Sequence, residues 1–215
     1  MTFSERVHEQ ADVTGSDARV RCRLREHDAQ VHGNFPMNET ETKSVQGSPF
    51  WRFSLQFYRQ PAVADACIQL QDEAGVDVNL LFFLLWFAMQ RRSFSASEVE
   101  WLESKVGPWR DATVIPIRNV RRALKVPPAL VAAATAELFR TKIKAVELEA
   151  ERLQQEAMYQ LAPAVPAGET VSSVAEAART NVSAYAAMLA KPFSPPAVDA
   201  LLAALRNMQR KPGDK

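Results

Sequence analysis

The clearest feature in the pattern of hydrophobic and polar positions is an unbroken apolar run from Leu80 to Met89. Polar residues flank it, with Asp77 and Asn79 before the run and Gln90 to Arg92 after it. A helix needs about 20 apolar residues to cross a bilayer, and this run has about half of them. Asp77 is a good N-cap for a helix that starts here. The pattern therefore predicts no transmembrane segment, but a helix buried on most sides in a helical protein.

Two short helices are predicted before this core helix. Ser48 can cap the first helix, and Pro49 then occupies its first turn, where a missing N–H costs nothing. Pro61 starts the second helix, whose apolar residues recur at helical spacing until Gly75 ends it.

Two further boundaries are expected after the core helix. Ser95 and Glu98 have the spacing of a capping box, which predicts a helix start. Pro108 is expected to begin another helix, and Pro116 to kink or interrupt it, because proline lacks the N–H that a helix needs. Residues 112–117 are the single place where the pattern leaves room for a short extended piece.

A long amphipathic helix is predicted from about residue 128 to residue 161. Its apolar residues follow each other at alternating steps of three and four, which is the a/d spacing of a coiled coil. Such a narrow stripe suits one partner helix, which belongs either to the same domain or to another chain. The large side chains of the stripe are the candidate partner contacts: Phe139, Ile143, Val146 and Leu153.

The chain divides into four parts on this reading. Residues 1–47 mix both charge signs with few large apolar side chains, which predicts a disordered leader. Residues 48–161 are expected to form a helical domain, residues 162–170 a linker, and residues 171–210 a C-terminal pair of helices. The expected fold class is all-α, a compact helical bundle with a long amphipathic helix.

The composition narrows the possible functions. The 26 Lys and Arg nearly balance the 25 Asp and Glu, so nucleic-acid binding driven by bulk charge is not expected. Cys22 and Cys67 lack a metal-ligand spacing, which predicts no metal site and favours a reducing, cytoplasmic location. His8, His27 and His32 all lie in the leader, which nearly excludes histidine-based catalysis. No phosphate-loop motif is present, and no cofactor is expected.

The strongest candidate site is a basic run between Lys105 and Lys125, in which six Lys or Arg face one acid. Four of these cations are spaced at i, i+3, i+4 and i+7 and would share a helix face, where they repel each other unless solvent or anions surround them. An anionic ligand or an acidic partner would suit this face; the alternative is a solvated face whose arginine stems cover apolar neighbours. The candidate residues are Arg110, Arg118, Arg121, Arg122 and Lys125.

A second candidate is a pocket beside the core helix. Asn79 and Trp86 are seven residues apart and therefore lie on one side of that helix. A buried amide needs hydrogen-bond partners, and with Asp77 at the helix start it would give an apolar pocket a polar point. Asp72 and Arg110 are expected to serve the same pocket. The alternative is that Asn79 is a satisfied polar group of the core.

Four motifs resemble those of a bacterial family known as a domain of unknown function. They are W-x-F-S-L-x-x-Y at Trp51 to Tyr58, L-Q-D at Leu70 to Asp72, D-V-N-x-L at Asp77 to Leu81, and P-W-R followed by V-x-P-x-R-x-x-R at Pro108 to Arg121. The resemblance covers about residues 49–160. It implies a bacterial, mostly helical, soluble protein and no particular activity.

These features predict a protein that acts by binding. The leading hypothesis is a protein partner or self-association through residues 128–161, with the basic face at 118–125 as a second contact. The alternative is an enzyme or small-molecule binder with its pocket near Asn79 and Trp86, and whether the protein is an enzyme stays open. Nucleic-acid binding through the arginine face is the weakest of the three hypotheses.

Overall fold

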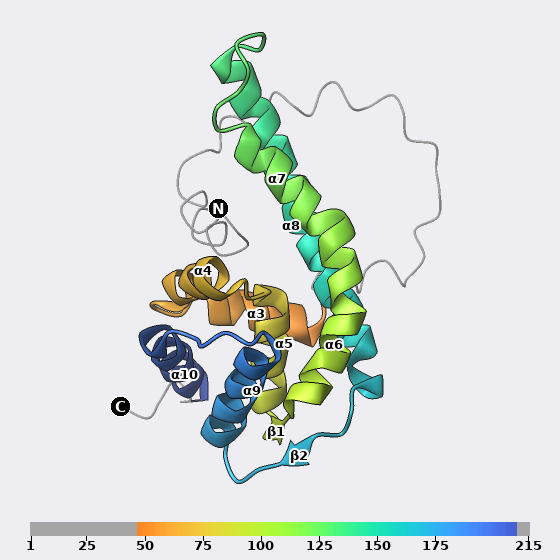
Figure 1. Cartoon of the computed structure of the whole chain (residues 1–215), viewed down its shortest axis with the longest axis vertical. Helices are drawn as coiled ribbons and strands as arrows, with labels where there is room; N and C mark the ends of the chain where they lie inside the picture. The colour runs from red at the N-terminus through yellow and green to blue at the C-terminus, as the bar shows by residue number, and fades with distance from the viewer. Residues whose placement is uncertain (1–46, 210–215) are drawn as a thin grey trace.

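The computed structural model describes residues 47–209. Apart from Gly47, the predicted disordered leader lies outside the described residues. The described part is mostly helical, which confirms the predicted all-α fold (Figure 1). The sheet found within it consists of two short antiparallel strands, β1 (Arg92–Ser93) and β2 (Glu169–Thr170).

The first short helix begins and the second ends as predicted, whereas the second begins at Val63, two residues after Pro61. α3 (Pro49–Tyr58) is capped by Ser48, whose hydroxyl oxygen accepts a hydrogen bond of 3.0 Å from the Trp51 N–H. α4 (Val63–Ala74) ends at Gly75, which has φ of 74°. This left-handed conformation is the one that glycine adopts without strain.

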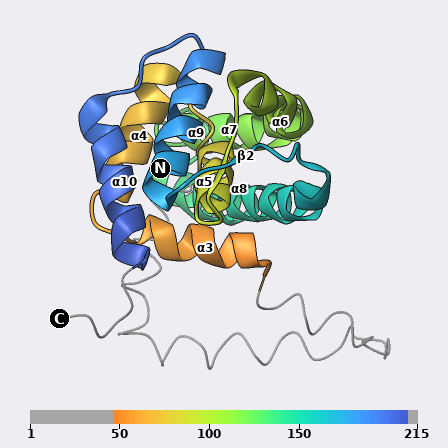
Figure 2. The same ribbon diagram turned by 90° about the horizontal axis from the view of Figure 1, so that it is seen from below.

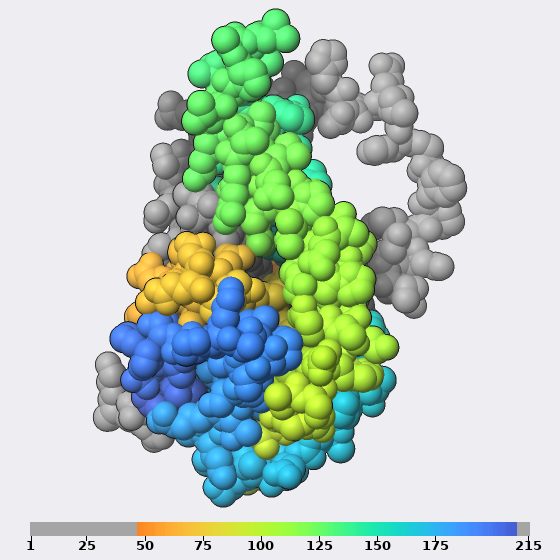
Figure 3. Space-filling view, in the orientation of Figure 1, coloured from red at the N-terminus to blue at the C-terminus, as the bar shows by residue number. Residues whose placement is uncertain are grey.

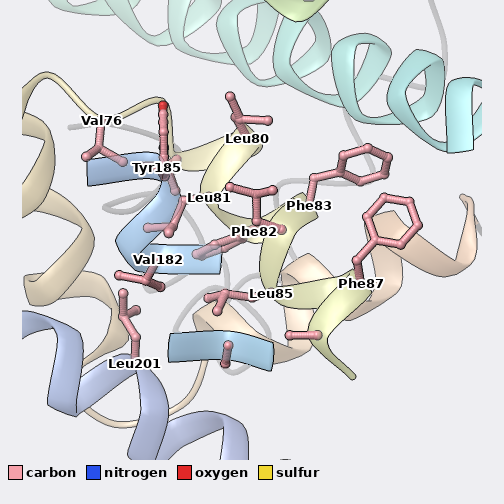
Figure 4. Packing of buried hydrophobic residues seen from close by; sticks show 14 of the residues in the cluster. Val76, Leu80, Leu81, Phe82, Phe83, Leu85, Phe87, Val182, Tyr185 and Leu201 are labelled. Atoms are coloured by element: carbon pink, nitrogen blue, oxygen red, sulfur yellow. The ribbon is translucent and has the colours of Figure 1, made fainter. Parts of the chain in front are cut away.

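The predicted core helix is α5 (Val78–Ala88), and all of its residues except Trp86 are buried. It packs against α3, α8 (Ala133–Leu161) and α9 (Val174–Met188), as Figure 2 shows from below. Its phenylalanines, leucines and neighbours from α9 interlock in Figure 4. Within residues 47–209, no helix is both long and apolar enough to cross a membrane.

The last helix, α10 (Pro195–Gln209), packs against α4 and α9. Its buried residues Leu201 and Leu205 belong to the same hydrophobic cluster as Phe50 of α3 and Leu80 of α5. The core therefore joins residues on both sides of the segment at 162–170, and it extends beyond the long helix in the sequence.

One continuous helical segment follows the capping box at Ser95 and Glu98, which forms as predicted. It comprises α6 (Ala96–Trp109), a π-helical turn (Arg110–Val114) and α7 (Ile115–Ala123). The predicted helix start at Pro108 is wrong, because this proline lies inside α6 and the helix tolerates the one missing hydrogen bond. Residues 112–117 are helical and not extended.

The predicted interruption at Pro116 takes the form of the π-helical turn. The N–H of Ile115 donates to the carbonyl oxygen of Arg110, five residues earlier, so the turn is one residue wider than an α-helical turn. Pro116 follows at once and stands in the first turn of α7, where proline fits. The wider π-helical turn therefore lies just before Pro116, which has no backbone N–H to donate.

α7 and the first half of α8 form a helical arm that projects from the body of the protein (Figure 1). Residues 124–132 connect the two helices at the far end of the arm, and we call them the tip loop. α8 ends at Leu161 as predicted, but it begins at Ala133 and not near residue 128. Residues 128–131 form a turn instead, in which the Val131 N–H donates a hydrogen bond of 3.1 Å to the carbonyl oxygen of Pro128.

The predicted linker at 162–170 is fastened to the body by its backbone. Arg92 donates hydrogen bonds to the carbonyl oxygens of Pro166 (2.8 Å) and Ala167 (3.1 Å), beside the β1–β2 pair. Gly168 has φ of 64°, and a Cβ added there would lie 2.4 Å from the carbonyl oxygen of Ser93. Only glycine fits so close an approach between the two segments.

We expect Phe82→Ala to lower the free energy of unfolding by about 3–5 kcal/mol, because it leaves a cavity in the core. Phe82 is fully buried, and its ring centroid lies 5.1 Å from that of Phe57. Urea unfolding followed by tryptophan fluorescence measures the change. Leu138→Ala is the control, since Leu138 is 71% exposed and its loss should cost less than about 0.5 kcal/mol. Equal losses in the two variants would contradict the proposed core.

Candidate functional site

A polar cavity of about 470 Å³ lies where α4, α5, the π-helical turn, α7, α8 and α9 meet. This volume is typical of small-molecule sites. Charged side chains dominate the lining: the acids Asp72, Asp77, Glu103, Asp111 and Glu151, and the arginines Arg110, Arg118 and Arg122. We call this the polar cavity.

Asp77 connects most of the polar cavity's lining elements. As the N-cap of α5, its Oδ1 accepts hydrogen bonds from the N–H groups of Asn79 (2.8 Å) and Leu80 (3.3 Å). Its other oxygen, Oδ2, lies 3.3 Å from Nη1 of Arg110 and 3.4 Å from Nε2 of Gln154. The carboxylate is 8% exposed, so one buried group both starts the core helix and anchors two other helical segments.

Arg110 lies at the start of the π-helical turn and is surrounded by carboxylates. Besides Asp77, it pairs with Glu103 on α6 at 2.7 Å and with Asp111 at 2.9 Å. Burial by itself lowers the pKa of an arginine, but the hydrogen bond to Glu103 and the charge of Asp77 outweigh it, and the pKa of Arg110 is raised. The π-helical turn therefore presents a fixed positive charge to the polar cavity.

Amide side chains continue the network below Asp77. The Asn79 amide donates to Oε1 of Gln154 at 2.8 Å, and its Oδ1 accepts from Gln155 at 2.7 Å. All three amides are at most 5% exposed. Buried amides need such partners, and here α8 supplies them to α5.

A second set of buried charges joins α7 to α8, and we call it the arginine–glutamate seam. Arg121 and Glu147 are both fully buried and form an ion pair. Arg118 bridges two turns of α8, with distances of 3.1 Å to Glu147 and 2.8 Å to Glu151. Burial lowers the pKa of Arg118, but the charge of Glu151 and the bond to Glu147 raise it overall. The two arginines and two glutamates neutralise one another.

Tyr185 of α9 lines the polar cavity and is supplied by the C-terminal part of the chain. Its hydroxyl oxygen accepts a hydrogen bond of 2.9 Å from the Asp77 N–H, and Figure 4 shows the side chain beside Val76. The tyrosine is 1% exposed, and burial, with the nearby Asp77 charge, raises its pKa well above the ordinary value.

The basic residues predicted to share one face are split between two environments. Arg118 and Arg121 turn inward to the arginine–glutamate seam, and Arg110 turns to Asp77. Arg122 is exposed and lines the polar cavity. Lys125 lies beyond the end of α7, exposed and away from the cavity. Arg118, Arg121 and Arg122 lie on α7 at the predicted spacing, whereas Lys125 does not belong to the helix. The spacing also does not show which cations find carboxylates on another helix.

The residues of the predicted pocket are also separated. Asp77 and Asn79 line the polar cavity, as do Asp72 and Arg110. Trp86 does not line it and packs instead among aromatic rings, with centroids 5.7 Å from Phe83 and 5.9 Å from Tyr159. Trp86 lies two turns along α5 from Asn79, too far to face the same cavity.

The predicted partner-binding stripe on α8 lies mainly at the surface. Phe139, Val146 and Leu153 are 50%, 52% and 45% exposed, and Ile143 is half-buried. Leu153 also lines a mostly apolar groove of about 460 Å³ between α6 and α8. The buried face of α8 carries glutamates and glutamines instead, together with Ala136, Ala150 and Met158.

Sequence reasoning missed the α8 side of the polar network and Tyr185. Glu147, Glu151 and Gln154 recur at helical spacing on one face, and that regular spacing was a usable signal. It was overlooked because polar residues are normally assigned to the exposed face of an amphipathic helix. No sequence signal connects Tyr185 to Asp77, because 108 positions separate them.

The described residues offer limited chemistry beyond binding. Among residues 47–209, no cluster of histidine, cysteine, aspartate or glutamate has the arrangement of a metal site. Cys67 is fully buried, and burial raises the pKa of its thiol, which disfavours the reactive thiolate. The three histidines lie outside the described residues.

Fold and site together define an all-helical protein with a charged cavity between its core helix and a projecting arm. The chain belongs to the family described as protein of unknown function (DUF2390), whose model matches residues 49–158. The match includes the polar cavity's lining except Tyr185 and Leu189 of α9. Searches of curated proteins and of solved structures found no match.

We expect Glu147→Gln to lower the free energy of unfolding by about 3–5 kcal/mol, because it removes the negative charge that pairs with the fully buried Arg121. The double variant Arg121→Met with Glu147→Leu should recover much of this loss, since it removes both members of the fully buried pair, and Arg118 keeps its pair with Glu151. Urea unfolding followed by circular dichroism compares the variants. Glu149→Gln removes the exposed pair with Arg152 and should cost at most about 0.5 kcal/mol. A loss no larger in Glu147→Gln than in Glu149→Gln would show that the seam contributes little.

Proposed function

We propose that the protein binds a small dipolar molecule, carrying both an ammonium and an anionic group, in the polar cavity. One observation carries the proposal: two lining residues of opposite charge, Asp72 on α4 and Arg122 on α7, have no ion-pair partner among residues 47–209. A ligand with both charges would pair with both residues. A zwitterion carries both charges and no net charge. It therefore also matches the lining of the polar cavity, in which most charged side chains pair with one another.

The inner charges favour this ligand class over a purely anionic one. Arg110 and Arg118 are already paired with carboxylates, so neither offers an uncompensated charge to an anion. The buried oxygens Gln71 Oε1 and Glu103 Oε2 have no hydrogen-bond partner among the described residues. Unpaired buried acceptors favour a ligand that donates, and an ammonium group donates three hydrogen bonds.

The lining is also held in place before any ligand enters. Asp77 and Arg110 are each fixed by several partners, and the π-helical turn supplies three lining residues from its widened backbone. Turns of this type occur frequently at functional sites. A site built from fixed groups loses little conformational entropy on binding, which favours affinity for a small ligand.

The proposal is tested by titrating free amino acids into the protein and measuring heat and thermal shift. We expect at least one amino acid to bind and to raise the melting temperature, while acetate and methylammonium, which carry one charge each, do not. Asp72→Asn and Arg122→Gln should each weaken binding about tenfold or more, because each removes a charge-assisted hydrogen bond. Both side chains are exposed, so the fold should persist.

Matched control residues lie close to Asp72 and Arg122 in the sequence. Glu73→Gln and Lys125→Gln remove the same charges from positions that do not line the polar cavity, and they should leave the affinity unchanged. Binding of acetate alone, or equal losses in Glu73→Gln and Asp72→Asn, would contradict the proposed ligand class. Failure of the whole amino-acid panel would reject it.

A second candidate function, self-association through α8, is favoured by the exposed apolar stripe. Phe139, Val146 and Leu153 follow each other at intervals of seven, so the stripe is symmetric about Val146. In an antiparallel pair of copies, Phe139 of each would oppose Leu153 of the other. This matches the self-complementarity that a twofold interface requires. The groove between α6 and α8 would widen the contact.

For this candidate, we expect Val146→Asp and Leu153→Asp to convert a dimer into a monomer, because each buries a charge in the apolar contact. Size-exclusion chromatography with light scattering measures the mass. Leu138→Asp is the control, because Leu138 is exposed but lies off the stripe. A wild-type protein that is monomeric at all concentrations would exclude self-association without affecting the ligand proposal.

A further inference from the structure

The tip loop lies at the end of the arm farthest from the body (Figures 1 and 3). It exposes large apolar side chains. Val126 and Leu130 are 86% and 95% exposed, and Val131 is 42% exposed. Single exposed hydrophobic residues are common, but an apolar group gathered on a projection points to an interaction surface. The polar cavity and the α8 stripe do not include these residues.

Beyond Lys125, the tip loop carries no charged residue. Residues 126–136 form an uncharged run in which Thr135 is the single polar side chain. Pro127 and Pro128 stand near the start of this run and restrict the backbone, so the apolar side chains are displayed at a small entropic cost. The tip loop is thus a stiff, convex and apolar end.

Positive charge surrounds this apolar end. Between Arg118 and Lys144 there are seven lysines or arginines and one acid, Glu137. Arg118 and Arg121 are neutralised by the seam, and Arg140 pairs with Glu137. Of the other four cations, Arg122, Lys125 and Lys142 have no ion-pair partner described among residues 47–209. The collar next to the apolar tip therefore keeps a net positive charge.

We propose that the tip loop inserts into the surface of an anionic lipid bilayer. The apolar residues of 126–131 would enter the boundary between headgroups and acyl chains, while Lys125 and the neighbouring cations meet the lipid phosphates. Reversible membrane binding requires two signals of this kind, apolar insertion and basic charge, because either one is weak by itself. A convex tip suits a deformable bilayer, whereas a protein partner would need a matching pocket.

The test is co-sedimentation of the full chain with lipid vesicles. We expect binding to vesicles of phosphatidylcholine and phosphatidylglycerol in equal parts, and little binding to phosphatidylcholine alone. Binding should weaken as salt is added, because salt screens the attraction between lysines and lipid phosphates. Tryptophan fluorescence would report little change, since the tip loop contains no tryptophan.

Substitutions separate the two signals. Leu130→Ser removes the most exposed apolar side chain and should lower the partition coefficient about tenfold. Lys125→Glu reverses one charge of the collar and should lower it at least about fivefold. Leu138→Ser and Lys191→Glu make the same changes at exposed sites outside the tip loop and should bind as the wild type does. Circular dichroism confirms that all four variants remain folded.

Three outcomes would overturn the proposal. The first is the absence of sedimentation with anionic vesicles. The second is equal binding to both vesicle types and no effect of Leu130→Ser. The third is a wild-type protein that forms a dimer and does not bind vesicles, and whose dimer is converted to a monomer by Leu130→Ser but not by Leu153→Ser. The tip loop would then contact a second copy of the chain. None of these results bears on ligand binding in the polar cavity.

Discussion

The buried carboxylate of Asp77 is the interaction on which the arrangement of the other parts depends. One oxygen starts the core helix α5, and the other holds Arg110 of the π-helical turn, while the backbone N–H of the same residue binds Tyr185 of α9. A charge buried this deeply is stable only when such partners surround it. The core, the base of the arm and the C-terminal helices therefore meet at one residue.

The arm shows how polar groups can replace a hydrophobic interface. α7 and α8 are joined by Arg118, Arg121, Glu147 and Glu151, in a place where apolar packing is the usual solution. Because the seam uses the polar side of α8, the apolar stripe with Phe139 and Val146 is left at the surface. The packing of α7 against the polar face of α8 therefore accounts both for the charged lining of the polar cavity and for the exposed apolar residues of the arm.

The helices and their ends were largely predictable, because they depend on residues close together in the chain. The caps at Ser48, Asp77 and Ser95 and the burial of α5 follow from local patterns. The helix start at Pro108 was predicted wrongly. α6 and the π-helical turn both pack against α8, and this packing stabilises a helix that continues through the proline. Part of the site was also foreseen: Asp77, Asn79, Arg110 and the inward-facing arginines were candidates, but their partners on α8 and α9 were not.

By itself, the sequence determined an all-helical protein with an apolar central helix and a basic segment around Pro116. It could do so because helix periodicity, caps and local charge are short-range properties. Only the tertiary structure decided that Arg121 is buried while Arg122 is exposed, and that Trp86 lies apart from Asn79. Those outcomes depend on which helix packs opposite each face. That pairing is set by the energy of burying whole faces across distant segments, which no short stretch of residues contains.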